Sequence, residues 1–280
     1  MGVYKMIEIP EANVLSIQLN ETVTGKRINN VTTLQSPHKF AWFNKDPQNY
    51  KNMLIGKVIT KTEAVAGYVE ITIEDVVLLF GDGVNLKYHG IEEKRPQKHQ
   101  LLVEFDDFTA ISASVQMYGG LWCFNIGEFD NSYYLHAKES ISPISKEFNR
   151  EYFNTILSAL KAEKLSAKAL LATEQRIPGL GNGSLQDILF NSKIHPKKKV
   201  SSFTETDKEN IFNSIKSTLK EMTQQGGRDT EKDLFGNLGG YITKLSKNKA
   251  NKPCKLCSTP IIKEAYMGGS IYYCPKCQKI

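Results

Sequence analysis

The chain has 280 residues, of which 40% are hydrophobic and 24% charged, with a formal net charge of +6 at pH 7. This length allows about two domains with their own cores, and the composition is that of a globular protein. No apolar run approaches the roughly 20 residues of a membrane helix, and residues 1–6 lack the apolar core of a signal peptide. We therefore expect a cytoplasmic protein without membrane contact. The positive charge leaves two alternatives, a polyanionic partner such as nucleic acid or a merely solvated basic surface.

The first half of the chain is predicted to be rich in β-strands. Alternating or continuous apolar runs are typical of strands, and four runs fit: 68–73, 76–80, 101–105 and 110–115. The last two predict a hairpin that turns at Asp106-Asp107. Gly81-Asp82-Gly83 and Gly119-Gly120 are expected to separate strands. Sheet-on-sheet packing is the natural way to bury such strands.

Beyond about residue 140 the apolar residues recur at helical spacing. Four helices are expected, and their apolar residues are Phe148, Tyr152, Ile156 and Leu160; Leu165, Ala169 and Leu170; Leu185, Ile188 and Leu189; and Ile211, Ile215, Leu219 and Met222. Thr204-Glu205-Thr206-Asp207 predicts a cap for the fourth helix, and Gly226-Gly227 predicts its end.

A glycine-rich turn is expected between the second and third helices. Ile177-Pro178-Gly179 stops a helix, and Asn182 lies at the expected N-cap of the next one. Such a turn, containing Gly179, Gly181 and Gly183, directs free amides and the positive end of a helix dipole at one spot, which suits a phosphate. The alternative is a plain connector. The lysines at 197–199, just beyond, favour the phosphate.

Four cysteines near the C-terminus follow the pattern C-x2-C-x16-C-x2-C and are Cys254, Cys257, Cys274 and Cys277. Two C-x2-C pairs can direct four thiolates at one point, which predicts a structural zinc site. The segment between the pairs predicts a hairpin that turns at 267–270, and the metal would supply its folding energy. The alternatives are two disulfides or free thiols. A single further cysteine, Cys123, and a reducing compartment favour zinc.

Several of these motifs together resemble the formamidopyrimidine-DNA glycosylase / endonuclease VIII family. Gln175–Pro196, with PGLGNG and IHPKKK, resembles that family's helix–two-turn–helix, and the cysteine pattern matches its zinc ribbon. The segment Gly226-Gly227-Arg228-Asp229 fits the connection between these elements. Near the other end, Ile7-Glu8-Ile9-Pro10-Glu11 is similar to the family's N-terminal Pro-Glu-Leu-Pro-Glu. The resemblance covers residues 6–280.

The resemblance implies an α+β fold in three parts. These are an N-terminal β-sandwich of the catalytic type over 6–135, a helical DNA-binding domain over 145–240 that contains the helix–two-turn–helix, and a zinc ribbon over 250–280 that holds one structural ion. It also implies a bacterial monomer, associated with the nucleoid, that binds damaged or abasic double-stranded DNA. Such a protein flips out and excises a damaged base, with strand cleavage at the abasic site as a further implied step.

The resemblance also implies roles for particular residues. Glu8 matches the family's acid/base carboxylate, and the four cysteines match its metal ligands. The positions implied for DNA binding are Lys87, Gln116, Met117, Tyr118, Gly181, Asn182, Lys197 and Lys198. Met117 and Tyr118, expected on a loop, could fill the gap that a flipped base leaves, or could be core residues. His99 and His195 have family-like neighbours, and their spacing assigns neither a role.

Three positions depart from the family's chemistry. Ile7 replaces the proline whose secondary amine is the nucleophile, Gly67 replaces a phosphate-binding lysine, and Gly269 replaces the arginine at the tip of the zinc hairpin. If Met1 is removed, Gly2 would offer a different amine; a start at Met6 is the other alternative. In addition, Asp82 stands where the family has a wedge methionine.

Three hypotheses follow from these departures. The first is a glycosylase that uses Glu8, with the lesion unspecified. The second is a catalytically impaired protein that binds damaged DNA, and the third is a ribbon that serves protein contacts only. The sequence leaves open whether catalysis survives.

Overall fold

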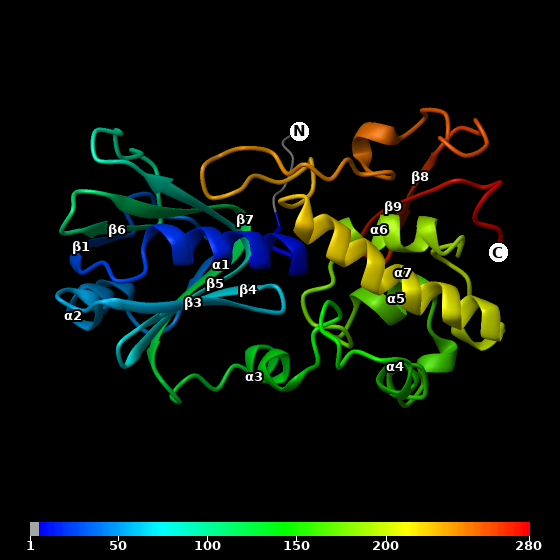
Figure 1. The fold of residues 1–280 in the computed structure, drawn as a ribbon, viewed down its shortest axis with the longest axis horizontal. Helices are drawn as coiled ribbons and strands as arrows, with labels where there is room; N and C mark the ends of the chain where they lie inside the picture. Colours follow the sequence, from blue (N-terminus) through cyan, green and yellow to red (C-terminus); the bar gives the residue numbers. More distant parts are fainter. Residues whose placement is uncertain (1–5) are drawn as a thin grey trace. The chain divides into compact units, whose positions relative to one another are not determined.

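The computed structural model describes residues 6–280 and groups them into two compact units (Figure 1). The first unit contains residues 6–135 and 225–241, and the second contains 136–224 and 242–280. Residues 225–241, which the sequence assigned to the helical domain, group with the first unit because Arg228 and Leu234 are buried there. The cysteine segment groups with the helices. The division into three domains stays a prediction.

The first unit is built on one seven-stranded sheet. Six of its strands follow the order β1-β6-β7-β5-β4-β3, and the seventh, β2, pairs in parallel with β7. Its strands are β1 (Ile28–Thr33), β2 (Ala41–Phe43), β3 (Ile59–Val65), β4 (Tyr68–Ile73), β5 (Val76–His89), β6 (Leu101–Phe105) and β7 (Ala110–Asn125). Its helices are α1 (Ile9–Thr22) and α2 (Tyr50–Leu54), and α3 (Ser132–Glu139) follows β7. The four predicted strand runs and the hairpin at 106–107 are confirmed.

Two long strands, β5 and β7, connect the layers of the sandwich. The first half of β5 pairs with β4, whereas its second half lies opposite the part of β7 that also pairs with β6. The change occurs at a bulge, where the register passes from Asp82–Gly119 to Val84–Val115. This arrangement gives the predicted β-sandwich.

The expectation that glycines separate these strands is wrong, since 81–83 lie inside β5 and 119–120 inside β7. Their role is close packing against aromatic rings. A Cβ on Gly81 would lie 2.7 Å from the Tyr68 ring, and one on Gly120 would lie 1.8 Å from the Trp122 ring. Both distances are far below van der Waals contact, so only glycine fits there.

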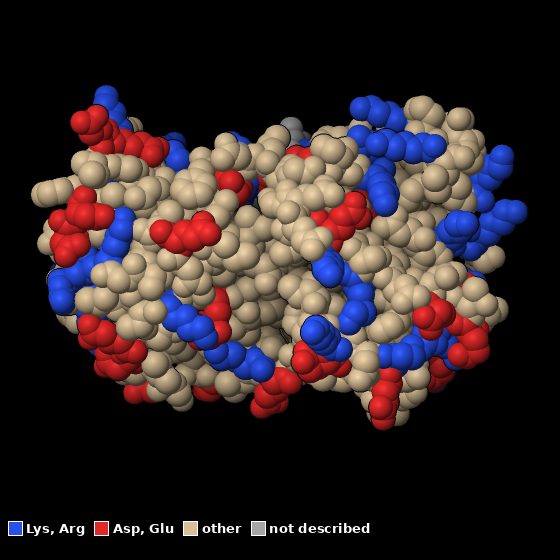
Figure 2. All heavy atoms as spheres, in the orientation of Figure 1, with Lys and Arg blue, Asp and Glu red and all other residues tan. Residues whose placement is uncertain are grey.

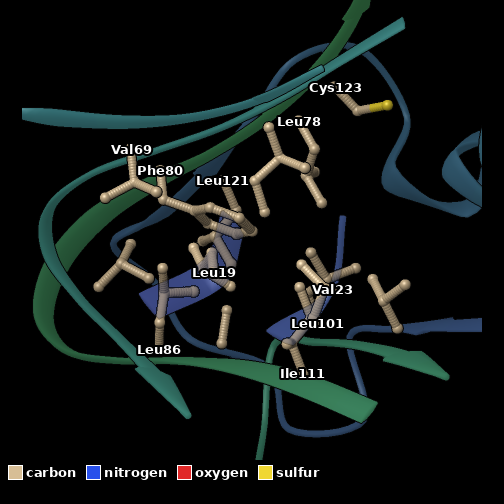
Figure 3. Packing of buried hydrophobic residues seen from close by; sticks show 14 of the residues in the cluster. Leu19, Val23, Val69, Leu78, Phe80, Leu86, Leu101, Ile111, Leu121 and Cys123 are labelled. Atoms are coloured by element: carbon tan, nitrogen blue, oxygen red, sulfur yellow. The ribbon is translucent and has the colours of Figure 1, made fainter. Parts of the chain in front are cut away.

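Helix α1 was not predicted. Its side chains Ala12, Leu15 and Leu19 are buried in the core formed with the sheet, and Figure 3 shows Leu19 and Val23 among strand residues such as Phe80 and Leu121. Helix α1 begins just after Glu8, whose backbone N–H donates to the Glu11 carboxylate at 3.3 Å. This reciprocal cap places the acidic residues of the N-terminal motif at the first turn of a helix.

The second unit contains the four predicted helices and the hairpin. These are α4 (Arg150–Leu157), α5 (Ala167–Ala172), α6 (Asn182–Asn191), α7 (Glu205–Gln224), β8 (Ile262–Tyr266) and β9 (Gly269–Tyr273). Thr204 and Asp207 exchange backbone-to-side-chain hydrogen bonds, which confirms the predicted cap of α7. Helix α4 ends before Leu160, which is exposed, so its assignment to the apolar face was wrong. Among residues 6–280, no helix combines the length and apolar character needed to cross a membrane.

Candidate functional site

The residue in the family's nucleophile position, Ile7, serves to anchor the N-terminal segment. Its side chain is buried in the core, and its backbone N–H donates to the carbonyl oxygen of Asp82 at 2.7 Å. The nitrogen of Ile7 belongs to a peptide bond, whose lone pair is delocalised into the carbonyl. It therefore cannot act as an amine nucleophile. Gly2, the alternative amine, lies outside the described residues.

Immediately after Ile7, a buried cluster joins the start of α1 to the segment after α7. The Arg228 guanidinium donates to Glu11 through Nε at 2.9 Å and Nη2 at 2.8 Å, and to Glu8 through Nη1 at 3.3 Å. Glu231 lies 4.0 Å from Nη2 and accepts a hydrogen bond from the Met6 backbone N–H at 3.3 Å. The acid/base candidate Glu8 is thus held in a fixed, water-poor position.

The cluster holds three buried carboxyl groups and one cation. Burial alone would lower the pKa of Arg228, but the charges of Glu11 and Glu8 outweigh burial and raise that pKa well above its ordinary value. Burial raises the pKa of Glu231 to about 7, although Arg228 opposes this shift. One carboxyl group of the three therefore titrates near neutral pH.

The titration of Glu231 predicts a pH-dependent stability that a Glu231→Gln variant will lack. The folded carboxyl group keeps its proton up to about pH 7, whereas the unfolded one loses it near 4.5. Because the folded state binds more protons in this window, Glu231 makes the protein less stable as pH rises from about 4.5 to about 7. Relative to wild type, the variant should gain about 2 to 3 kcal/mol over that range, measured by urea unfolding at pH 5 and pH 8. A constant difference between the two proteins would contradict the assignment.

Residues 116–118, implied as a gap-filling loop, lie within β7 instead. At the bulge they face only Gly83 and have no paired residue on β5. The Tyr118 ring is half-buried and lies 5.6 Å from the exposed ring of Trp42, tilted by 31°. The loop expectation was wrong in its secondary structure, and the role of these residues stays a prediction. Burial also raises the pKa of the neighbouring Asp82 carboxyl group.

The lysines implied for DNA binding each lie beside one carboxylate. The pairs are Lys87 with Glu93, Lys197 with Glu264, and Lys198 with Asp207 at 2.8 Å. The Lys87 and Lys197 pairs are partly exposed, and such pairs contribute little stability, so these two lysines can exchange a carboxylate for a phosphate. Lys198 and Asp207 are both only 19% exposed, so their pair is harder to break. Beside the lysines at 197–199, the Lys197 backbone N–H donates to His195 Nδ1 at 3.1 Å. This hydrogen bond gives His195 a structural contact.

The glycine-rich turn differs from the expectation in its cap. The N-cap of α6 is Gly181, in an extended conformation, and Asn182 is the first helical residue. The Asn182 side chain is used elsewhere, because its Nδ2 donates to the Ser270 carbonyl oxygen at 3.0 Å. The predicted cap was wrong since the amide side chain binds the hairpin rather than its own helix.

Gln186 strengthens this contact between α6 and the hairpin. It is buried, its Nε2 donates to the Ser270 carbonyl oxygen at 3.3 Å, and its Oε1 accepts from the Tyr272 N–H at 3.0 Å. The glycine-rich turn and the hairpin are therefore brought together in one unit. Gln186 belongs to none of the motifs recognised in the sequence. A polar side chain next to Leu185 on the apolar face of a helix was the available signal.

The four cysteines converge as predicted. Their sulfur atoms lie within 4.8 Å of one another, with individual Sγ–Sγ distances of 3.4, 3.5 and 3.9 Å. A tetrahedral site with metal–sulfur bonds of about 2.3 Å separates its sulfurs by about 3.8 Å. These distances are far too long for disulfides. Two backbone amides, of Leu256 and Cys277, also donate to cysteine sulfurs. The four residues fit a metal ion.

Basic side chains surround this ribbon. Figure 2 shows Lys and Arg gathered over and beside the residues around 247–255 of the second unit, and Lys247, Lys252 and Lys255 are exposed there. A surface of this kind favours a polyanion over a neutral partner.

The antiparallel sandwich, the helices on either side of the glycine-rich turn and the four-cysteine hairpin follow one another in the order that the resemblance to zinc-ribbon DNA glycosylases implied. The family model "Formamidopyrimidine-DNA glycosylase H2TH domain" matches residues 140–233. The chain is thus similar to the formamidopyrimidine-DNA glycosylase family, whose helix–two-turn–helix model it matches over its helical part.

Relatives and solved structures resemble the chain over nearly its whole length. A formamidopyrimidine-DNA glycosylase of Lactobacillus delbrueckii subsp. bulgaricus is 28% identical over 98% of this chain and 100% of its own. One of Bacillus cereus is 28% identical over 98% and 99%. The Lactococcus lactis Fpg bound to DNA with an abasic site has a TM-score of 0.82 at 23% identity, covering 98% of this chain and 100% of its own. At this identity the structural likeness supports the fold.

Proposed function

We propose that this protein is a DNA-repair glycosylase that binds damaged or abasic duplex DNA and excises a damaged base. The proposal rests on one observation in the second unit. The side chains of Asn182 and Gln186, in and just after the glycine-rich turn, both donate hydrogen bonds to Ser270 of the cysteine hairpin. The solved structures similar to this chain support it, since the Lactococcus lactis protein is described in complex with abasic-site DNA and with N7-benzyl-Fapy-dG DNA.

We further propose that the four cysteines hold one structural zinc ion. Thiolate-only ligands in tetrahedral positions suit zinc, and the short hairpin between them has little core of its own. The relatives come from bacteria, which supports a protein that acts on the DNA of a bacterial cytoplasm, and we propose that it acts as a monomer. Its proposed DNA contacts are Lys87, Gln116, Met117, Tyr118, Gly181, Asn182, Lys197 and Lys198.

The chemistry must proceed without an amine at position 7. We propose that water is the nucleophile: its oxygen attacks the sugar carbon while the bond to the base breaks, and the departing base takes the bond's electron pair. Glu8 is the proposed acceptor of the proton that water loses. Arg228 and the first turn of α1 fix its carboxylate in place. Gly2 remains the alternative source of an amine, and the comparisons favour an enzyme over a binding protein without activity.

A Glu8→Gln variant tests this assignment. We expect base release from lesion-containing duplexes to fall by about two orders of magnitude or more, since general acid–base groups contribute that much. Binding should change only a few-fold, because glutamine keeps the shape. Glu21→Gln, an exposed residue of the same helix, is the matched control. Unchanged base release would rule out Glu8 as the acid/base group.

Borohydride trapping on the same substrates separates the two nucleophiles. A covalent adduct would identify an amine, whereas base release without an adduct supports water. If the protein binds a panel of lesion-containing duplexes but gives neither base release nor a covalent adduct, the alternative holds instead: a catalytically impaired protein that binds damaged DNA.

A further inference from the structure

Asp82 lies at a strained backbone position of β5, directly beside the residue in the family's nucleophile position. Its carbonyl oxygen accepts the Ile7 backbone N–H at 2.7 Å. Its φ is +58°, in the left-handed region that strains most residues other than glycine. It also begins the bulge that interrupts the pairing of β5 with β7. Bulges and strained residues are frequent at functional sites, where they re-aim a side chain.

The carboxyl group of Asp82 is partly exposed, and the protein gives it no partner. In the described range, 6–280, no group donates a hydrogen bond to it and no lysine or arginine lies in ion-pairing distance. Burial raises the pKa of this carboxyl group, and no neighbouring cation opposes the change. Asp82 therefore keeps its proton to a higher pH than an exposed aspartate does.

Two tyrosines and one glutamate are the titratable groups around Asp82. Burial raises the pKa of the Tyr118 phenol on β7, and the charges of Asp82 and Glu8 add to this effect. Burial and then the charge of Asp82 also raise the pKa of Tyr68 on β4. Glu8 follows Ile7, which is bonded to the Asp82 backbone. The Tyr118 phenol thus lies within electrostatic reach of both carboxyl groups.

The surroundings of Glu8 and Asp82 differ in the way that general acid–base catalysis uses. Glu8 accepts a hydrogen bond from the Arg228 guanidinium at 3.3 Å, whereas Asp82 is surrounded by phenols and has no cation. A neighbouring cation favours the charged form of a carboxyl group, and burial favours the neutral form. Two carboxyl groups separated in this way act as base and acid in the cleavage of glycosidic bonds.

Aromatic rings beside Asp82 offer a surface for a base. In the strand registers, Asp82 lies opposite Gly119 of β7, and Trp42 of β2 lies opposite Gly120. The exposed Trp42 ring is 5.6 Å from the half-buried ring of Tyr118. Nucleobases stack readily on aromatic rings that are open to solvent. A base stacked on these rings would lie near the carboxyl group of Asp82.

We propose that Asp82 is the general acid that protonates the departing base, while Glu8 is the general base that activates water. As the bond between the sugar carbon and the base breaks, the base takes the electron pair and the Asp82 carboxyl proton. Glu8 takes the proton that the attacking water loses. Asp82 ends the step ionised and Glu8 protonated, and proton exchange with solvent restores both. This inference rests on the proposed function, since it adds a second group to the same reaction.

A purely structural role for Asp82, in which its carbonyl oxygen anchors Ile7, is the competing explanation. Asp82→Asn separates the two roles, because asparagine keeps the carbonyl oxygen, the shape and the tolerance for left-handed backbone but has no acidic proton. Asp82→Gly is a second variant without the proton, and glycine suits the left-handed conformation best. Asp106→Asn, which changes an exposed aspartate between β6 and β7, is the matched control.

The experiment measures single-turnover base release from duplexes that carry 8-oxoguanine, 5-hydroxycytosine or thymine glycol, on whichever of them the wild-type protein cleaves fastest. Asp82→Asn and Asp82→Gly should release the base at least about 100-fold more slowly, the usual contribution of a general acid. Affinity for a duplex with a tetrahydrofuran abasic-site analogue should stay within about threefold, because the acid acts on the base, which that analogue lacks. Asp106→Asn should match the wild-type protein in both measurements.

The pH profile gives a readout that a structural role would not move. Wild-type base release should slow as pH rises through the pKa of Asp82, since the ionised acid has no proton to give. Asp82→Asn should lack this decline. Glu231 also titrates near neutral pH, so Glu231→Gln is measured beside it and should keep the decline.

The outcomes distinguish the inference from the function on which it rests. If the Asp82 variants keep wild-type base release, or lose release and abasic-site affinity together, Asp82 is not the general acid and the proposed function stands. Slow release with an unchanged pH profile would show that Asp82 acts only through its position, which also overturns the inference. If the wild-type protein releases no base from any of the duplexes, the proposed function and this inference both fail.

Discussion

A Cys254→Ser variant is expected to lose the proposed zinc ion, the ordered β8–β9 hairpin and most of the affinity for DNA. The apolar support of this segment is small, since its buried cluster consists of a few residues such as Phe190, Leu245 and Ile261 beside the cysteines. Zinc binding contributes about 10–16 kcal/mol to the folding of isolated zinc-finger peptides. Without it, residues 250–280 should unfold locally while the helices of the second unit remain.

Hydrogen exchange and metal analysis together check this result. Protection in β8 and β9 should disappear in Cys254→Ser and in wild-type protein treated with a strong chelator, and the zinc content should fall from about one per chain to zero. Cys123→Ala, which removes the buried thiol of the first unit, should keep both the zinc content and the protection of β8 and β9. A Cys254→Ser protein with one bound zinc and wild-type protection would show that the ribbon folds without four thiolates.

The hairpin also positions Gly269 and Ser270 for α6, so its unfolding has consequences beyond the ribbon. Asn182 and Gln186 would lose their common partner, the Ser270 carbonyl oxygen. The glycine-rich turn would then lose its fixed side-chain orientation. For this reason loss of the metal should reduce DNA affinity more than the loss of any single lysine.

The cysteine site and the helices were predictable because their signals are local. A C-x2-C spacing determines the geometry of its own two thiolates, and apolar periodicity determines which face of α7 is buried. The turn at 179–183 and the hairpin turn at 267–270 were also visible in the sequence, each as a glycine-rich segment. Their attachment through Asn182 and Gln186 was not, since it joins residues 84 to 88 positions apart.

The errors have a common physical origin in long-range contacts. Glycine at 81 and 120 suggested turns, but the determining contacts are with the rings of Tyr68 and Trp122. Helix α1 was missed because its short apolar face is defined by the sheet that it covers. Arg228 appeared as part of a connecting segment, and its partner Glu11 lies 217 positions earlier in the chain. Single-sequence patterns do not encode such pairs.

Replacing Arg228 with methionine should destabilise the first unit by about 3–5 kcal/mol at pH 8, the usual cost of removing one partner from a buried ion pair. The variant leaves Glu8, Glu11 and Glu231 buried without their cation. Their protonation in the folded state then becomes favourable, so the folded state binds more protons than the unfolded one. The destabilisation should therefore be smaller at pH 5 than at pH 8.

Tryptophan fluorescence during urea unfolding reports this unit, because both tryptophans, Trp42 and Trp122, belong to it. Arg27→Met, which removes an exposed arginine of the same unit, is the matched control and should cost at most about 1 kcal/mol. Arg228→Lys should fall between the two, since a single ammonium cannot reproduce the guanidinium's two bonds to Glu11 together with the one to Glu8. If Arg228→Met unfolds within 1 kcal/mol of wild type at pH 8 and also keeps base release, the cluster is not what fixes Glu8. Loss of base release in a stable variant would instead show that Arg228 positions the Glu8 carboxylate for catalysis.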